Sequence, residues 1–261
     1  MQSAVLLDER EGPVAFLRLN CPGSKNALDA ELAGALARAL ENAALDPAVR
    51  AIVLAGEGGT FCSGADLKQA LYDLDRGIAI GSQLATFQAS IRSIASAGKP
   101  VIAAVDGAAV GFGADLALAC DLRLLSARAY LQEKFVGIGL MPDGGGTFHL
   151  TRLIGTGRAL ELLLLGEKIE APQALEWGLA NRVLPPELLI PEALALARRL
   201  AEGPPLALAE IKAAARAALS GTLEQALSRE AQGQSRLLRS ADFREGVAAW
   251  VERRKPDFHG E

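Results

Sequence analysis

Apolar and polar positions along this chain predict short buried strands that alternate with amphipathic helices. Apolar or alternating runs indicate strands at Val14–Leu19, Ala51–Leu54, Val101–Val105 and Leu122–Leu125. Apolar residues at helical spacing indicate helices at Leu28–Ala44, Gln83–Ala97, Leu116–Ala119, Thr156–Leu165 and Ala171–Gly178. From about Pro205 to Arg254 the chain is predicted to be almost wholly helical. This order predicts an α/β core over residues 1–200 and a helical region over residues 201–261.

The breaks between these elements carry turn and cap residues. Pro22-Gly23 ends the first strand, Asp29 is placed to cap the helix that follows, and Asp46-Pro47 ends that helix. Tyr72–Ile80 is polar with a central Gly77, and we expect it to be a mobile loop near the ligand. No low-complexity segment or clear short-period repeat interrupts the sequence.

Charge and composition exclude several classes of partner and site. The 261 residues carry 27 basic and 31 acidic side chains, a net charge of -4, which gives no reason to expect nucleic-acid or membrane binding. No apolar stretch reaches the roughly 18 residues of a membrane span, and the amino-terminal segment lacks the basic residues of a signal peptide. Three cysteines without metal-type spacing indicate reduced thiols, so we expect a cytoplasmic protein. Only two histidines are present, which argues against imidazole catalysis and histidine metal sites.

The segment most informative for chemistry is Lys99–Asp121, KPVIAAVDGAAVGFGADLALACD. A buried strand breaks at Asp106-Gly107, and the run Gly111-Phe112-Gly113 then opens a helix. Glycines on both sides of Phe112 let the backbone approach a ligand closely, and the first N–H groups of a helix have no partner within it. Together with the helix dipole, these N–H groups suit an anion or a developing oxyanion. Asp115 follows in the first turn, where its carboxylate either reaches the same bound group or only complements the dipole.

A second segment with the same pattern is Gly59–Lys68, GTFCSGADLK. Small residues lead to Ser63-Gly64-Ala65, where a helix is predicted to start and to leave the Ala65 N–H free. The N–H groups of Ala65 and Phe112 are therefore placed to grip one carbonyl oxygen from two sides. The plainer interpretation is two ordinary glycine-rich turns.

A third segment is Gly139–Gly146, GLMPDGGG. Pro142 forces Met141 out of helical conformation, and three glycines follow Asp143. The Asp143 carboxylate is thus held on a rigid turn beside flexible backbone. It serves there either as a catalytic base on a loop or as a turn-forming residue that bonds its own backbone.

Together, and in this order, the three segments resemble the crotonase superfamily, also called the enoyl-CoA hydratase/isomerase family. The resemblance covers nearly the whole chain, and it is carried by Pro22, Lys25-Asn26-Ala27-Leu28, Ser63-Gly64-Ala65-Asp66-Leu67, Lys99–Asp121, Gly137–Pro142, Glu245-Gly246-Val247 and Lys255-Pro256. It implies an α/β fold, a ClpP-like spiral of β-β-α turns with a C-terminal helical region that builds a trimer. It also implies an acyl-CoA thioester substrate, no separate cofactor, no metal, and a homotrimer or dimer of trimers.

The resemblance further implies roles for individual residues. The N–H groups of Ala65 and Phe112 match the family's oxyanion hole, although the second position is usually a glycine. The Phe112 side chain must then either reshape the acyl pocket or pack below it. Residues expected to contact the CoA moiety or the rest of the substrate are Lys25, Ala27, Ser63, Asp66, Leu67, Gly111 and Phe135.

The carboxylates that face the acyl chain decide what such a site does. Two N–H donors on a thioester carbonyl stabilise the enolate oxygen and so acidify the proton on C2. Family hydratases carry one glutamate just after the glycine run and a second further along. Asp115 occupies the first place, but Phe135 occupies the second, so the hydratase pair is incomplete. Glu133 lies nearby, at an offset that need not put it on the same face.

Asp143 falls where several family isomerases, including the 3-enoyl, dienoyl and ring-epoxide CoA isomerases, carry an acidic residue. We therefore predict a double-bond or ring-type enoyl-CoA isomerase of fatty or aromatic acid degradation. Asp143 would be the proton-shuttling base, helped by a pKa that an apolar pocket raises, and Asp115 an auxiliary acid or orienting group. Alternatives are a hydratase that uses Asp115 and Asp143, thioester hydrolysis, or a CoA-binding scaffold with little catalysis. A dinucleotide-binding protein is excluded, because Gly111–Leu116 lacks the third glycine of that fingerprint.

Overall fold

The computed structural model describes residues 4–78 and 80–261 and folds them around two sheets. The larger sheet has the strand order β1-β2-β3-β4-β6-β9, and these strands are Leu6–Glu11, Val14–Leu19, Ala51–Gly56, Val101–Val105, Leu122–Ser126 and Arg182–Leu184. The β1–β2 hairpin is antiparallel, whereas the pairs from β2 to β9 are parallel. Parallel sheets are covered on both faces, which is why β3 and β4 are runs of apolar residues.

The smaller sheet has the order β5-β7-β8, with strands Ala108–Val110, Tyr130–Gln132 and Lys168–Glu170. Successive turns of the chain contribute one strand to each sheet, since β4 is followed by β5 and β6 by β7. An isolated parallel bridge between Cys62 and Ala109 extends the smaller sheet to the turn after β3. The core is therefore a stack of similar turns, as in a spiral.

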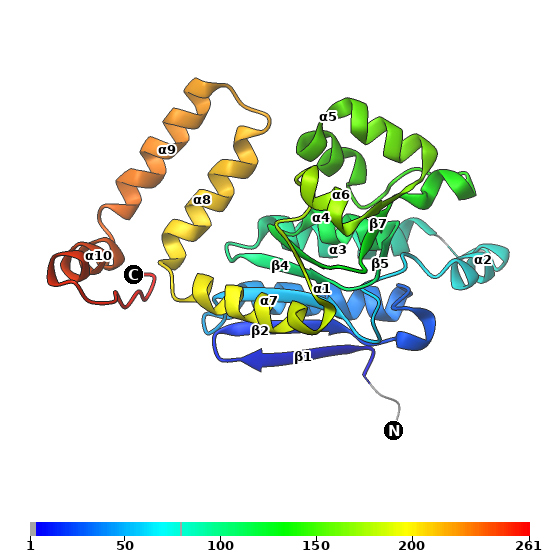
Figure 1. Cartoon of the computed structure of the whole chain (residues 1–261), viewed down its shortest axis with the longest axis horizontal. Coiled ribbons are helices and arrows are strands. Elements are labelled where there is room, and N and C mark those ends of the chain that lie inside the picture. Colours follow the sequence, from blue (N-terminus) through cyan, green and yellow to red (C-terminus); the bar gives the residue numbers. More distant parts are fainter. Residues whose placement is uncertain (1–3, 79) are drawn as a thin grey trace.

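Helices cover both faces of the larger sheet (Figure 1). α1 (Ala30–Leu45) and α3 (Ile80–Ser96) pack together on one side, and α7 (Pro186–Ala201) lies on the other. Alternate residues of β3 serve the two sides: Leu54 packs in the cluster below α1, and Val53 in the cluster below α7. The Asp29 carboxylate accepts from Leu32 N at 2.8 Å, so the predicted cap of α1 is confirmed.

α4 (Phe112–Ala119) is buried along its whole length at the centre of the core. α3 and α5 (Gly146–Leu165) pack against it. α5 breaks at Gly155, whose φ of 77° and ψ of 160° are not helical, so only its second half was foreseen from the sequence. α4 therefore holds its first turn, with Asp115, against the start of α5.

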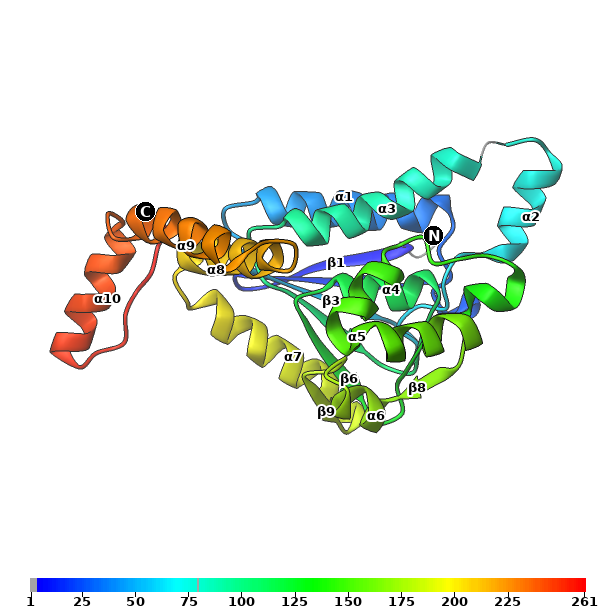
Figure 2. The ribbon, with the colours of Figure 1, turned by 90° about the horizontal axis from the view of Figure 1, so that it is seen from above.

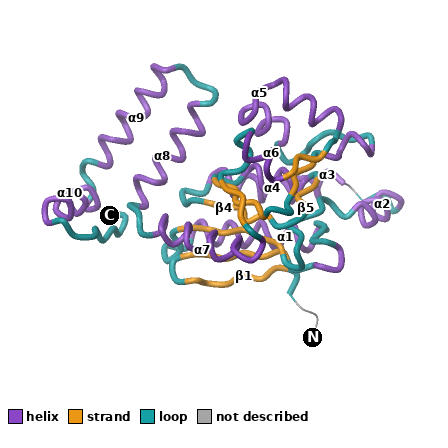
Figure 3. The backbone as a smooth tube through the Cα atoms, viewed as in Figure 1, coloured by secondary structure: helices purple, strands orange, loops and turns teal. Residues whose placement is uncertain are grey.

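The C-terminal helices project from this core (Figures 2 and 3). They are α8 (Pro205–Ala218), α9 (Leu223–Leu237) and α10 (Ala241–Glu252). Two cations of α8 attach it to the core, because Lys212 Nζ and Arg216 Nη2 each lie 2.7 Å from the carboxylate of Asp121. Within the described ranges, every helix is too short or too polar to cross a bilayer.

The remaining elements are short, and α2 occupies part of a segment that the sequence predicted to be a loop. They are the 3-10 helices Pro22–Ser24 (η1) and Lys134–Ile138 (η2), and the α-helices α2 (Leu67–Asp75) and α6 (Ala171–Glu176). The loop predicted at Tyr72–Ile80 is wrong at both ends, since α2 runs to Asp75 and α3 begins at Ile80, while residue 79 lies outside the described residues. Leu67, Leu71 and Leu74 lie at helical spacing in the sequence, a signal for α2 that the predicted loop did not take into account, and their side chains are exposed in the structure.

Candidate functional site

Three carboxylates gather where α4, the end of β7 and the start of α5 meet. Asp115 lies in the first turn of α4, Glu133 directly follows β7, and Asp143 lies in the turn before α5. The backbone N–H of Gly144 donates to Asp115 Oδ2 at 2.9 Å and ties this turn to α4. Asp115 and Glu133 are only 0% and 5% exposed, and Asp143 is partly buried. The structure thus brings Asp115 and Asp143 together, as the sequence suggested, and adds Glu133.

Glu133 is a member of this cluster to which the sequence alone assigned no role. Its offset from position 135 left the direction of its side chain open, and the structure turns its carboxyl group toward Asp115, since a Cβ on Gly146 would meet both groups. The physical reason is that Glu133 lies between β7 and η2, where the backbone leaves the extended conformation. Periodicity along a strand does not predict the direction of a side chain at such a junction.

Gly144 and Gly146 make room for these carboxylates. A Cβ at Gly144 would lie 2.7 Å from Asp115 Oδ2. A Cβ at Gly146 would lie 2.5 Å from Asp115 Oδ1 and 2.8 Å from Glu133 Oε1. The glycine run after Asp143 is therefore required by the close approach of the acidic side chains, as well as by the φ of 101° at Gly145.

Burial raises the pKa of all three carboxyl groups, because it disfavours their charged forms. For Asp115 the pKa rises to about 7: burial is the main cause, the N–H of Gly144 opposes it, and the charge of Asp143 adds to it. Burial and then the charge of Asp115 hold the pKa of Glu133 well above its usual range. Burial also raises the pKa of Asp143. The cluster therefore keeps at least one proton at neutral pH.

The backbone of Asp143 is anchored, but its side chain keeps a buried oxygen available. Gln88 of α3 donates from Nε2 to the Asp143 carbonyl oxygen at 2.9 Å. Asp143 Oδ1 is buried and has no hydrogen-bond partner among the described residues. A carboxylate on a fixed backbone, with an unused acceptor and a raised pKa, has the properties of a general base.

The N–H group of Ala65 points away from the segment that pairs with it. Leu28 N donates to Gly64 O at 2.8 Å, and Asp66 N donates to Leu28 O at 2.8 Å. In this parallel bridge the two neighbours of Ala65 make the hydrogen bonds, so its own N–H faces the opposite side. Within the described residues, the Ala65 N–H makes no hydrogen bond.

The N–H group of Phe112 lies beside the same segment. Cys62 N donates to Ala108 O, and Val110 N donates to Cys62 O, both at 3.0 Å, so the two chains run together up to Gly64. A Cβ at Gly64 would lie 3.7 Å from Phe112 N. At the first position of α4, the Phe112 N–H has no acceptor among the residues that the structure describes. Two unused donors are thus brought to neighbouring positions.

The Phe112 ring packs into the core, which decides between the two positions that the sequence left open. The side chain is 1% exposed, and its ring centroid lies 5.4 Å from that of Phe87 on α3. The ring also lies 2.8 Å from where a Cβ on Gly144 would be. Phe112 therefore offers its backbone N–H at the helix start, while its ring fills space between α3 and the Asp143 turn.

Lys25, Ala27 and Ser63 belong to two loops held together by hydrogen bonds. Ser63 N donates to Lys25 O at 3.1 Å. The neighbouring Asn26 belongs to the motif that carries the resemblance but was given no role from the sequence; it is fully buried, and its Nδ2 donates to the carbonyl oxygens of Glu57 (2.9 Å) and Thr60 (2.7 Å). Its signal was a buried amide next to a residue in left-handed conformation, which only the folded chain reveals.

Two further predicted contact residues lie at the start of α2. The Asp66 carboxylate accepts from the backbone N–H groups of Lys68 and Gln69, so it serves as the N-cap of α2. Leu67, the first residue of α2, is 46% exposed. Phe135 lies elsewhere, with its ring about one van der Waals contact (3.6 Å) from where a Cβ on Gly111 would be. The ring thus lines the glycine turn that precedes α4.

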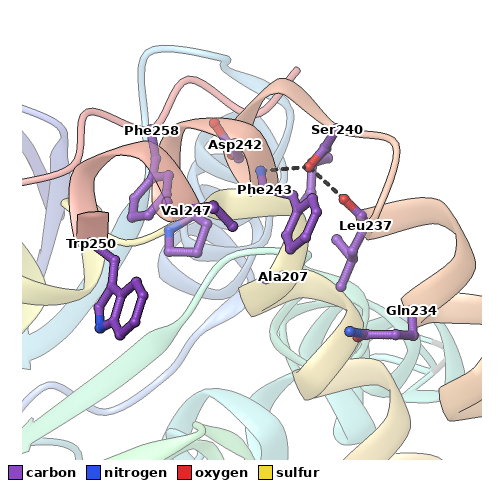
Figure 4. Close-up of a pocket in the computed structure, with 12 residues that line it drawn as sticks. Ala207, Gln234, Leu237, Ser240, Asp242, Phe243, Val247, Trp250 and Phe258 are labelled. Carbon is purple, nitrogen blue, oxygen red and sulfur yellow. Dashed lines mark hydrogen bonds between the residues drawn. The ribbon is translucent and has the colours of Figure 1, made fainter. Parts of the chain in front are cut away.

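A cavity of about 640 Å³ lies outside this site, among α8, α9 and α10 (Figure 4). Phe243, Val247 and Trp250 of α10 line it, and Phe243 N donates to Ser240 Oγ at 3.0 Å at the start of that helix. No carboxylate of the cluster at α4 contributes to it. The chemistry expected at Asp115 and Asp143 therefore does not belong to this cavity.

A family model described as enoyl-CoA hydratase/isomerase matches residues 9–261. The chain belongs to the enoyl-CoA hydratase/isomerase family. It is therefore an enzyme with the crotonase fold, as the resemblance in its sequence implied.

Among the relatives of this enoyl-CoA hydratase/isomerase family member, some are named hydratases and others isomerases. It is 42% identical to a probable enoyl-CoA hydratase of Rhodobacter capsulatus, over 95% of each chain. It is 39% identical to the 1,2-epoxyphenylacetyl-CoA isomerase of Escherichia coli, over 98% of each chain. Among solved structures, an enoyl-CoA hydratase from a Polaromonas species superposes with a TM-score of 0.93 at 37% identity, covering 97% of this chain and 99% of that one.

Proposed function

We propose that this protein is an enoyl-CoA isomerase, acting on a double bond or on a strained ring of an acyl-CoA thioester. The thioester oxygen would be bound by the N–H groups of Ala65 and Phe112, and Asp143 would carry a proton away from C2 and return it to a more remote carbon. The observation that carries this proposal is the buried, unpartnered Oδ1 of Asp143 beside the start of α4.

Two N–H donors at the thioester oxygen favour the enolate, because they stabilise the charge that appears on oxygen when C2 loses its proton. The proton then needs a single acceptor that can release it again. The raised pKa of Asp143 suits this exchange, since a base whose pKa lies nearer to neutrality gives a proton back more readily. Asp115, with a pKa of about 7, would act as an auxiliary acid or orient the acyl group.

A hydratase needs a second polar group that holds a water. At the position of the family's second glutamate this chain has Phe135, whose ring packs on Gly111 and offers no acceptor for water. Similarity to a ring-epoxide isomerase supports isomerisation, and similarity to a probable hydratase supports the alternative in which Asp115 and Asp143 act as the pair.

To test this proposal, turnover by the purified protein is measured in separate assays with a 3-enoyl-CoA, a ring-epoxide acyl-CoA and a 2-enoyl-CoA. We expect turnover of the first or second, and a loss of roughly 10²–10⁴ in kcat for Asp143→Asn with little change in KM. Asp8→Asn, which removes an exposed carboxylate from β1, is the matched control and should leave the rate unchanged. Fast hydration of 2-enoyl-CoA that Asp143→Asn leaves intact would contradict the isomerase, and tight CoA binding without turnover would favour the scaffold.

We also propose that α8–α10 pack against other copies of this chain in a homotrimer or a dimer of trimers. The cavity among these helices is open and apolar, and Trp250 at its rim is 82% exposed. Exposed apolar surface of this kind marks protein interfaces. Light scattering after size exclusion should give at least three copies for the wild type and fewer for Trp250→Glu. Leu45→Glu, at an exposed apolar position on α1, is the control, and a monomeric wild type would refute the assembly.

A further inference from the structure

We propose that Glu133 remains a neutral acid at neutral pH and donates its hydrogen to Asp115, which makes it a positioning residue for the acid beside Asp143. Its effect on turnover rests on the proposed function, but its protonation does not. Asp115 Oδ1 and both carboxyl oxygens of Glu133 are buried, and none has a hydrogen-bond partner among the described residues.

Two ionised carboxylates cannot satisfy one another, since neither carries a donor. Both groups nevertheless face the same point, where a Cβ on Gly146 would lie 2.5 Å from one and 2.8 Å from the other. One hydrogen between them joins Asp115 Oδ1 to one of the two carboxyl oxygens of Glu133 and so gives two of these three oxygens a partner. Repulsion between like charges favours that arrangement, because two carboxylates that share a site do not both ionise.

Among residues 4–78 and 80–261, none supplies a cation beside Glu133 that could replace the hydrogen. A cavity of about 10 Å³ beside it is too small for more than about one water. Besides Glu133, Gln132 and Glu167, this cavity is lined by apolar side chains, namely Ala114, Leu118, Leu131, Leu150, Leu162 and Ile169.

The titratable groups around Glu133 are themselves acidic, exposed or neutral. Asp115 of α4 and Asp143 before α5 both act on it as negative charges. Glu167 and the neighbouring Lys134 are exposed to solvent. On α5, His149 is held neutral by burial, which lowers its pKa to about 4.

Within the pair, Glu133 is the member that keeps the hydrogen. Asp115 Oδ2 accepts the N–H of Gly144 at 2.9 Å, and such a bond favours the anion. Glu133 accepts no hydrogen bond within the described residues, so nothing stabilises its charge. The hydrogen of Glu133 on Oδ1 and the N–H of Gly144 on Oδ2 then fix the plane of the Asp115 carboxylate.

The decisive measurement is a carbon-13 NMR titration of the labelled carboxyl groups in the whole protein, which does not depend on turnover. Glu133, assigned through Glu133→Gln, should remain protonated at pH 7. The Asp115 midpoint should stay within about half a unit in Glu133→Gln, which keeps a donor. It should rise by about one unit in Glu133→Leu, which removes it. Glu167→Gln removes an exposed carboxyl from the same cavity and should leave the midpoint in place.

The direction in which the Asp115 midpoint shifts distinguishes a neutral Glu133 from an ionised one. If Glu133 were ionised, both substitutions would delete a negative charge and lower the Asp115 midpoint, and this result would overturn the proposal. Should Glu133→Leu fail to fold, the titration of Glu133 in the wild type, assigned through Glu133→Gln, decides alone. In the pH profile of kcat/KM, the Asp115 limb should follow the same shifts. An NMR result as expected in a protein without isomerase activity would refute the proposed function and leave the protonated Glu133 standing.

Discussion

Gly144 donates its backbone N–H to the carboxylate of Asp115 at 2.9 Å, across 29 positions of sequence. The contact leaves no room for a side chain, because a Cβ at Gly144 would lie 2.7 Å from both Cβ and Oδ2 of Asp115. We therefore expect Gly144→Ala to push the Asp143 turn away from α4. Overpacking of this kind costs about 1–3 kcal/mol of stability, and the displaced base should cost at least about tenfold in kcat/KM.

Gly137→Ala is the matched control for that substitution. It lies in η2, and its nearest neighbour, Lys134 Cγ, would be 3.8 Å from the new Cβ, an ordinary contact. Urea unfolding and steady-state kinetics on both variants check the prediction. Equal behaviour of the two would show that the Gly144 contact does not hold the turn in place.

Phe112→Leu distinguishes the role of the backbone N–H of Phe112 from the role of its ring. The N–H at the start of α4 is kept, while the ring packed on Phe87 is lost, so we expect a loss of roughly 1–3 kcal/mol of stability and less than a tenfold loss of kcat/KM. Phe87→Leu removes the other ring of the pair and is the control for stability. A large rise in KM for Phe112→Leu with unchanged urea midpoint would instead place the ring in contact with the acyl chain.

The contribution of the Asp115 carboxyl to the stability of the protein should fall as pH rises from about 4 to 7. The unfolded chain releases this proton near its usual pKa of 3.8, whereas the folded chain keeps it until about 7, because burial raises the pKa. In this window the folded state binds more protons, so each pH unit costs it up to about 1.4 kcal/mol.

Asp115→Asn removes that proton and keeps the shape of the side chain. The difference in unfolding free energy between variant and wild type should therefore grow in favour of the variant from pH 5 to pH 7. Urea midpoints at each pH measure it. A difference that is flat with pH would mean that Asp115 titrates normally.

Arg123 closes the other end of α4. It is 5% exposed, and its guanidinium donates to the carbonyl oxygens of Cys120 (2.6 Å) and Leu179 (2.7 Å). Arg123→Met would leave these buried acceptors unpaired, and we expect about 3 kcal/mol of lost stability. Arg199→Met, at an exposed position on α7, is the control and should change the urea midpoint little.

Strands with strong apolar patterns were predictable from the sequence, since β2, β3, β4 and β6 bury most of their residues and differ from prediction by at most two residues at one end. The three-residue strands β5, β7, β8 and β9 were not, because pairing with distant segments, rather than their own pattern, makes them strands. The first half of α5 was not predicted, since it begins inside the glycine run that follows Asp143 and ends at the break at Gly155.

The residues of the candidate site likewise include some that local sequence signals predicted and some that only the folded chain revealed. Asp115 and Asp143 follow local signals, a helix start and a proline-glycine turn, and the structure brings them together. Glu133 follows no local signal, since its role depends on where α4 and α5 lie after folding. The ring of Phe112 could be assigned to the core only once Phe87 of α3 was placed beside it.

The closeness of Gly146 to Asp115 and Glu133 restricts the order in which this chain can change over evolution. A side chain at Gly146 is compatible only with a smaller residue at one of the two acidic positions, so the acid must be replaced first. The reverse order passes through a chain that overpacks its own site. A related chain that keeps both acidic side chains is therefore expected to keep glycine at this position, whereas one that has lost either acid can carry a larger residue there.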